Sequence, residues 1–149
     1  MLPQMQPPAR EEVMSAASRL NRAFSQALVL PFCQCSRYVL VSDCHRGVGN
    51  AADNFLKNQH LYYAAMEHYY RNGFTYIEMG DGEELWENRK LRHITEIHED
   101  VYCLFARFEE KGRLHLLYGN HDIVRRKNPA FLEAVILYAQ SMPATRPAS

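Results

Sequence analysis

The stretch that decides the fold is RYVLVSDCHRG, residues 37–47, in which a run of β-forming apolar residues ends in a polar, glycine-bearing loop. A short apolar run of this kind is typical of a buried strand. The same design recurs in FTYIEMGDG, residues 74–82, and in LHLLYGNHD, residues 114–122. We therefore predict three strands, each followed at once by a polar turn, over residues 37–42, 74–79 and 114–118.

Helical patterns separate these strands. Apolar residues recur at helical spacing from Glu11 until Pro31 and over residues 52–71. A third helical stretch opens at Glu83, and its pattern continues in two pieces over residues 89–110. Pro129 opens a last helix that runs to about residue 140. This alternation predicts an α/β fold with a mainly parallel sheet and right-handed crossovers. We expect a flexible lead-in over residues 1–10, one domain over 11–140 and a disordered tail over 141–149.

Composition excludes several classes of protein. The formal net charge of the 149 residues is zero, so we expect no general nucleic-acid binding, which needs a basic face. No stretch approaches the roughly 20 apolar residues that span a bilayer, and the N-terminus does not have the pattern of a secretory signal. We predict a cytoplasmic protein. Its cysteines fit neither a zinc ribbon nor a disulfide framework, which favours reduced thiols, with a redox or zinc role for Cys33 and Cys35 as the weaker alternative.

The three polar turns carry residues that suit a metal site. Because the carboxyl ends of parallel strands meet at one edge of a sheet, the turns are expected to converge there. Asp43 and His45, two residues apart, can both reach one divalent cation, and this pairing suits Zn, Mn or Fe more than Ca or Mg. Asp81, after the small Gly80, can bridge two cations, and the amide oxygen of Asn120 can bind the second.

Such a pair of metal ions would clamp the oxygens of a phosphate and activate a hydroxide. His121 is placed to protonate the leaving group. Taken singly, each motif is also explained by an ordinary turn, but the three together favour the metal site. Arg46 follows the first ligand pair, and two interpretations remain open for it: contact with a phosphate oxygen, or a solvated loop arginine.

The set Asp43-Cys44-His45, Gly80-Asp81 and Gly119-Asn120-His121-Asp122 resembles the calcineurin-like metallophosphoesterase superfamily, in particular a bacterial branch of it, over residues 38–122. The resemblance implies an αββα sandwich, of which this chain would form the first half. It also implies hydrolysis of a phosphomonoester or phosphodiester with two divalent ions (Mn, Fe or Zn). The resemblance implies that Asp43 and His45 bind the first metal, that Asp81 bridges the two metals and that Asn120 binds the second. It further implies that His121 is the general acid and that Glu84 orients it. Asp122 would support its turn without binding metal.

The later histidine motifs of that superfamily do not appear after Asp122. We therefore expect an N-terminal portion of a longer enzyme or a truncated product, in which the incomplete sheet promotes self-association. The alternative is an inactive remnant that binds metal or a partner weakly. The phosphate ester itself stays unidentified.

Overall fold

The computed structural model describes residues 15–127, and the chain divides into two compact units, Met1–Gln34 and Cys35–Ser149. In the first unit, helix α1 (Ala16–Ser25) begins at Ser15, whose Oγ accepts a hydrogen bond from the N–H of Ser18 at 3.2 Å. This confirms the predicted first helix over residues 16–25. The helix ends at Ser25 and does not continue to Pro31 as predicted, and its predicted start lies outside the described part. No residue of α1 is buried.

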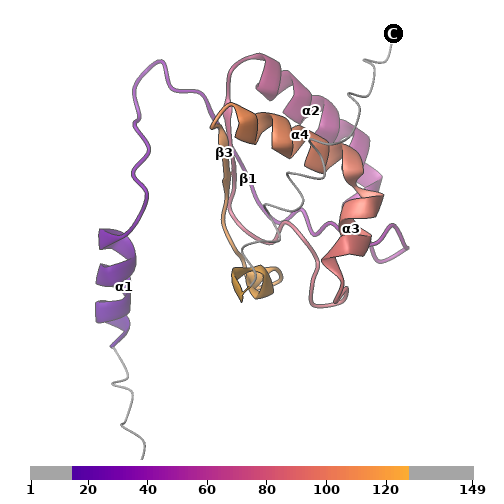
Figure 1. The fold of residues 1–149 in the computed structure, drawn as a ribbon, viewed down its shortest axis with the longest axis horizontal. Coiled ribbons are helices and arrows are strands. Elements are labelled where there is room, and N and C mark those ends of the chain that lie inside the picture. The colour runs from indigo at the N-terminus through magenta and orange to yellow at the C-terminus, as the bar shows by residue number, and fades with distance from the viewer. Residues whose placement is uncertain (1–14, 128–149) are drawn as a thin grey trace, which may run out of the picture. The chain divides into compact units, whose positions relative to one another are not determined.

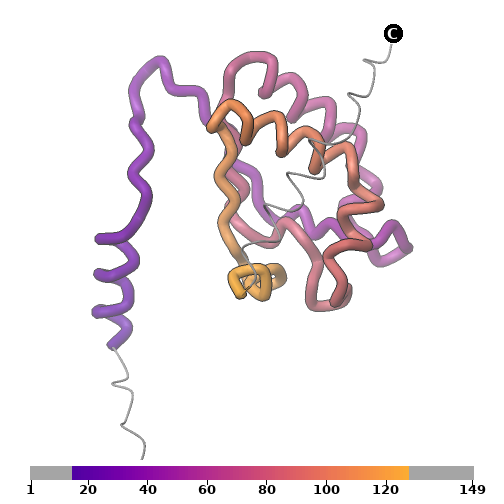
Figure 2. The backbone as a smooth tube through the Cα atoms, viewed as in Figure 1, coloured from indigo at the N-terminus to yellow at the C-terminus, as the bar shows by residue number. Residues whose placement is uncertain are grey.

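The second unit is built on a small sheet. Strands β1 (Tyr38–Val41), β2 (Thr75–Glu78) and β3 (Leu114–Leu116) are all parallel and lie in the order β1-β2-β3. Figure 2 shows the strands side by side, with the segments that follow them leaving at the same end of the sheet. The α/β class and the parallel sheet are therefore confirmed, and the wider sandwich stays a prediction.

Two helices cover one face of this sheet. Helix α2 (Gln59–Arg71) and helix α4 (Glu99–Glu110) lie beside each other (Figure 1). They enclose a core with the inward side chains of the strands, including Met66, Tyr76, Phe105, Phe108 and Leu114. The predicted burial of the first strand holds for one face only, because Val39 and Val41 pack on this core whereas Leu40 is 55% exposed.

The helix predicted over residues 52–71 begins later than expected. Asp53 accepts hydrogen bonds from the backbone N–H groups of Phe55 and Leu56 at 3.1 Å, and of Gly49 at 2.9 Å. An aspartate that binds nearby backbone in this way favours a turn. The chain therefore passes through a short 3-10 helix η1 (Leu56–Asn58) before α2.

The predicted helical stretch from Glu83 is wrong, whereas the two pieces beyond it are confirmed as α3 (Leu91–Ile97) and α4. The N–H of Arg46 donates to the Gly82 carbonyl at 2.9 Å, and the N–H of Glu84 donates to the Arg46 carbonyl at 3.0 Å. The backbone of residues 82–84 pairs with the loop after β1, so its N–H and carbonyl groups are not available for helical hydrogen bonds. A second 3-10 helix, η2 (Ile123–Lys127), follows β3. The helix predicted from Pro129 lies outside the described residues.

The cysteines differ from the prediction in part. Cys33 and Cys35 are disulfide-bonded, so the prediction of reduced thiols is wrong for these two, and a disulfide offers no thiolate to zinc. Cys44 and Cys103 are free. Burial raises the pKa of Cys44 to about 11, so its thiol stays protonated near neutral pH. Over residues 15–127, none of the helices has the length and apolar character needed to cross a membrane.

Candidate metal centre

Parallel pairing continues beyond β1 and β2 and brings two polar turns together. The N–H of Asp43 donates to the Gly80 carbonyl at 3.3 Å, and the N–H of His45 donates to the Asp81 carbonyl at 3.0 Å. As a result, one potential ligand atom from each of Asp43, His45 and Asp81 lies within 4.8 Å of the other two. Three of the four predicted metal ligands are therefore neighbours in space.

These three residues share an uncommon backbone conformation. Asp43, His45 and Asp81 have φ angles of 55°, 48° and 54°, in the left-handed region that few residues other than glycine adopt, although Asp and His do so more often than most. Each such residue costs about 1–3 kcal/mol, and strain of this kind persists where the surroundings hold it and tends to cluster at functional sites. The strain therefore coincides with the three predicted ligands that lie together.

The turn after β3 closes against Asp81. The N–H of His121 donates to Asp81 Oδ1 at 2.8 Å. A Cβ on Gly119 would lie 2.2 Å from Asp81 Oδ1, and a Cβ on Gly80 would lie 2.5 Å from the Gly119 nitrogen. Glycine is required at both positions for the turns to approach this closely. Asn120 is exposed between Gly119 and His121, and its role as a metal ligand stays a prediction.

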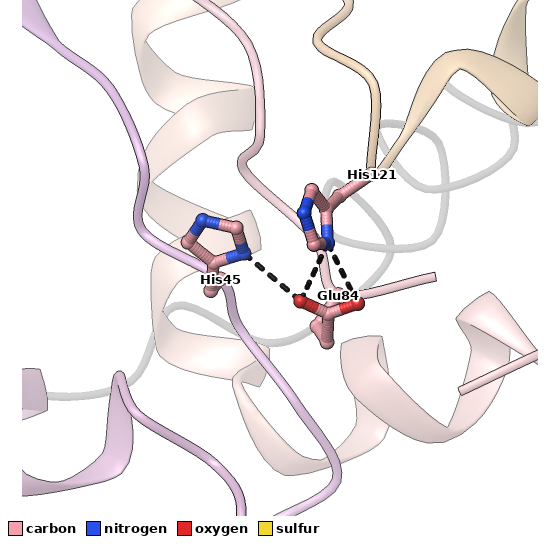
Figure 3. Close-up of side chains that lie close together, drawn as sticks. All are labelled: His45, Glu84 and His121. Carbon is pink, nitrogen blue, oxygen red and sulfur yellow. Dashed lines mark hydrogen bonds and ion pairs between the residues drawn. The ribbon is translucent and has the colours of Figure 1, made fainter. Parts of the chain in front are cut away.

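Glu84 lies between two imidazole rings (Figure 3). Its Oε2 is 2.9 Å from His45 Nδ1 and 2.8 Å from His121 Nδ1. The opposite ring nitrogen of His45, Nε2, lies 3.8 Å from Asp43 Oδ1. A carboxylate bound to one ring nitrogen fixes the orientation of the imidazole and leaves the other nitrogen for a metal or a proton. Glu84 was predicted to orient His121 alone, and in the structure it contacts both histidines.

His45, Glu84 and His121 also bring ligand atoms within 4.8 Å of one another, so Glu84 itself is a conceivable ligand. The contacts of its carboxylate favour an orienting role. Oε2 lies within hydrogen-bond distance of His45 Nδ1 and His121 Nδ1, at 2.9 and 2.8 Å. Glu84 Oε1 also accepts the backbone N–H of Trp86 at 3.2 Å, so both carboxylate oxygens are already engaged.

The contacts of Glu84 shift the ionisation of the cluster. Its hydrogen bond raises the pKa of His121 above the ordinary value. Burial alone would raise the pKa of Glu84, but the hydrogen bonds from His121 and His45 hold it below its usual range. The stable arrangement is an ionised carboxylate beside a His121 that keeps its proton to higher pH than a free histidine, which suits a general acid.

Trp86 was not predicted as part of the site. Its indole ring stacks on the His121 ring, with 3.9 Å between centroids and 25° between planes. The ring of His45 meets that of His121 edge-on at 4.5 Å. The sequence offers one weak signal, an aromatic residue two positions after Glu84, which the incorrect helix assignment obscured.

Arg46 requires a correction. Its side chain is 0% exposed, and its guanidinium donates to both oxygens of Glu78 at 2.8 and 2.7 Å and to Glu83 at 2.9 Å. Burial alone would lower the pKa of Arg46, but these carboxylates raise it well above the ordinary value. This position excludes a solvated loop arginine and gives Arg46 a structural role in place of the predicted phosphate contact.

Arg46 belongs to a buried chain of alternating charges beneath the metal centre. Glu83 also accepts from Arg125, and Arg125 lies 3.7 Å from Asp122. Asp122 in turn accepts the N–H groups of Gly82 at 3.0 Å and Gly119 at 2.7 Å, which confirms that it supports its turn. We call this set the charge ladder; its members are Glu78, Arg46, Glu83, Arg125 and Asp122.

Comparison with known proteins gave no match: no family model fits the chain, and no curated protein or solved structure resembles it significantly. The likeness to metallophosphoesterases therefore rests on the sequence motifs and stays a prediction. What stands independently is the geometry, in which Asp43, His45 and Asp81 form a three-ligand group and Glu84 joins His45 to His121.

Proposed function

We propose that this chain provides the metal-binding side of a metal-dependent phosphoesterase, which hydrolyses a phosphomonoester or phosphodiester with two divalent ions. The observation that carries the proposal is the convergence of Asp43, His45 and Asp81 within 4.8 Å, each on left-handed backbone. Three separated pieces of sequence supply this cluster and its supporting groups, and strained backbone is retained there.

The donor set fits borderline divalent ions. Two carboxylates and an imidazole nitrogen suit Zn, Mn or Fe better than Ca or Mg. Asp43 and His45 Nε2 would hold the first ion, Asp81 would be shared, and Asn120 would offer a neutral oxygen to the second. When bound, such a pair of ions supplies an activated hydroxide and neutralises charge on the phosphate.

The remaining residues prepare the proton transfer. In the hydrolysis, a water molecule gives one proton to solvent and its oxygen forms a bond to phosphorus. The ester P–O bond breaks, and the departing oxygen takes a proton from His121, which regains it from solvent. Glu84 holds the Nδ1 side of His121 at 2.8 Å, so the Nε2 side is left for the leaving group. The raised pKa of His121 keeps this proton available near neutral pH.

The second candidate function is that of an inactive remnant, which binds metal weakly and does not catalyse hydrolysis. The observation that favours it is the ligand count: over residues 15–127, the candidate donors to the second ion are Asp81 and the exposed Asn120. Few protein donors give weak metal binding, because they replace little of the lost hydration of the ion.

Hydrolysis of p-nitrophenyl phosphate and bis(p-nitrophenyl) phosphate tests the proposal. We expect Mn²⁺-dependent turnover that a chelator abolishes and that Asp81→Ala lowers by at least about 100-fold, because a lost metal removes several kcal/mol of transition-state stabilisation. Asp100→Asn, an exposed aspartate of α4, is the matched control and should leave the rate unchanged. Equal rates for the Asp81 variant and the wild type would refute the assignment. Metal binding without turnover would instead support the remnant.

A further inference from the structure

Trp86 combines a fixed position with an open surface. Its ring stacks on His121 at 3.9 Å, and its backbone N–H donates to Glu84, the same carboxylate that holds His121. Its side chain nevertheless remains 62% exposed. One part of the indole is thus held against the candidate acid, while most of its surface is available to a ligand.

The location of Trp86 identifies the part of a substrate that would reach it. In the proposed function, His121 donates its proton to the departing oxygen, so groups beside His121 lie beside the leaving group. The metal ligands Asp43 and Asp81 group with His45, and Asp81 contacts His121 through the backbone N–H and not through the ring that stacks on Trp86. Trp86 therefore borders the leaving group and not the phosphate.

We propose that Trp86 is a stacking platform for a flat aromatic leaving group, so that the site takes small nucleoside phosphates. This inference rests on the proposed function of His121. An exposed indole face binds planar rings well, and stacking on a nucleobase is tolerant of which base is present. The formal net charge of zero does not supply the excess of positive charge that helps to bind a long polynucleotide backbone, which favours a free nucleotide over a nucleic-acid strand.

The platform has a built-in probe, because Trp86 is the only tryptophan of the chain. Adenosine 5′-monophosphate, adenosine and ribose 5-phosphate are titrated into the full chain while indole fluorescence is recorded, first without metal and then with Zn²⁺, which does not quench by paramagnetism. We expect saturable quenching by the two adenine compounds and none by ribose 5-phosphate.

Calorimetry of two variants measures what the ring contributes. Trp86→Ala should weaken binding of adenosine 5′-monophosphate by about tenfold, with Trp86→Phe intermediate, since a smaller ring still stacks. Binding of ribose 5-phosphate should not change. Leu61→Ala is the control for general hydrophobic binding, because Leu61 is an exposed apolar residue of α2, and it should bind as the wild type does.

The outcomes separate the two proposals. If adenine compounds bind Trp86→Ala as they bind the wild type, or quench nothing in either metal state, the platform is wrong even where Zn²⁺ binds. If Trp86→Ala slows hydrolysis of aryl and alkyl phosphates equally, Trp86 only positions His121, and the platform is again wrong. If adenosine binds through Trp86 but Zn²⁺ does not bind at all, the phosphoesterase proposal and the leaving-group assignment fail, and only the stacking of adenine on Trp86 stands.

Discussion

Two environments lie next to each other at the carboxyl edge of the sheet, and consecutive residues divide between them. One is the partly exposed cluster of Asp43, His45, Asp81, Glu84 and His121, and the other is the buried charge ladder. In three pairs of consecutive residues, one side chain belongs to the cluster and the other to the ladder. His45, Glu84 and His121 belong to the cluster, and their neighbours Arg46, Glu83 and Asp122 belong to the ladder.

The difference teaches how the site is held in place. A buried ion pair adds little net stability, because desolvation offsets the attraction, but removing one partner is costly. Burial alone would raise the pKa of Glu83, and Arg46 with Arg125 holds it below its usual range. We infer that the ladder fixes the backbone of all three turns, while the cluster above it stays free for chemistry.

The largest expected effect tests this division directly. Glu83→Ala leaves Arg46 and Arg125 buried without their shared carboxylate and should lower the free energy of unfolding by about 3–5 kcal/mol. Glu84→Ala, one residue further on, removes a partly exposed partner of two histidines and should cost about 1 kcal/mol or less. Urea unfolding followed by circular dichroism measures both. Equal losses in the two variants would remove the distinction between ladder and cluster.

A smaller effect is expected where the turns meet. Gly119→Ala places a Cβ 2.2 Å from Asp81 Oδ1 and 2.5 Å from the Asp81 nitrogen, and we expect a loss of about 1–3 kcal/mol. Gly112→Ala is the matched control. It has a φ of 60° but nothing within 4 Å of the added atom, so only the left-handed conformation costs it, about 1–2 kcal/mol. Metal affinity should fall in the first variant alone, and an unchanged affinity there would show that the close approach is unimportant.

The smallest effect concerns pH. The hydrogen bond that His121 donates to Glu84 raises the pKa of His121. The stabilising contribution of this bond is fully present below the pKa of an unfolded histidine and is lost as pH rises through the raised value. Glu84→Gln should move the titration midpoint of His121 down. Trp86 emission reports it, since Trp86 is stacked on His121, with His121→Ala as the control that removes the transition. An unchanged midpoint in Glu84→Gln would contradict the orienting role of Glu84.

Much of the fold follows from periodicity. The three strands, their parallel pairing and the two-piece helix before β3 were predictable, because short β-forming runs and helical spacing are local signals. The position of Asp43, His45 and Asp81 also followed, since parallel strands bring their ends together. The turn from Glu83 was misassigned because its conformation comes from pairing with the loop after β1, which no local pattern encodes.

The charge ladder was missed for a related reason, although one signal was present. Tyr76 and Glu78 occupy the same face of β2 as the core, and a glutamate at such a position needs a buried cation. The sequence does not say which arginine that is, because loop residues have no fixed periodicity. Arg46 therefore appeared to be available to phosphate, and only the three-dimensional contacts assign it to Glu78.

Calorimetric titration of the metal-free chain with Mn²⁺ tests the central claim most directly. The wild type and Asp100→Asn should bind Mn²⁺ with the same affinity, while Asp81→Asn should bind it at least about 100-fold more weakly. This loss exceeds the roughly 10–100-fold expected when a residue that only hydrogen-bonds to a metal ligand is removed. Saturable binding that depends on Asp81 is the predicted result. Equal binding by all three proteins, or none by the wild type, would contradict a metal site built on Asp43, His45 and Asp81.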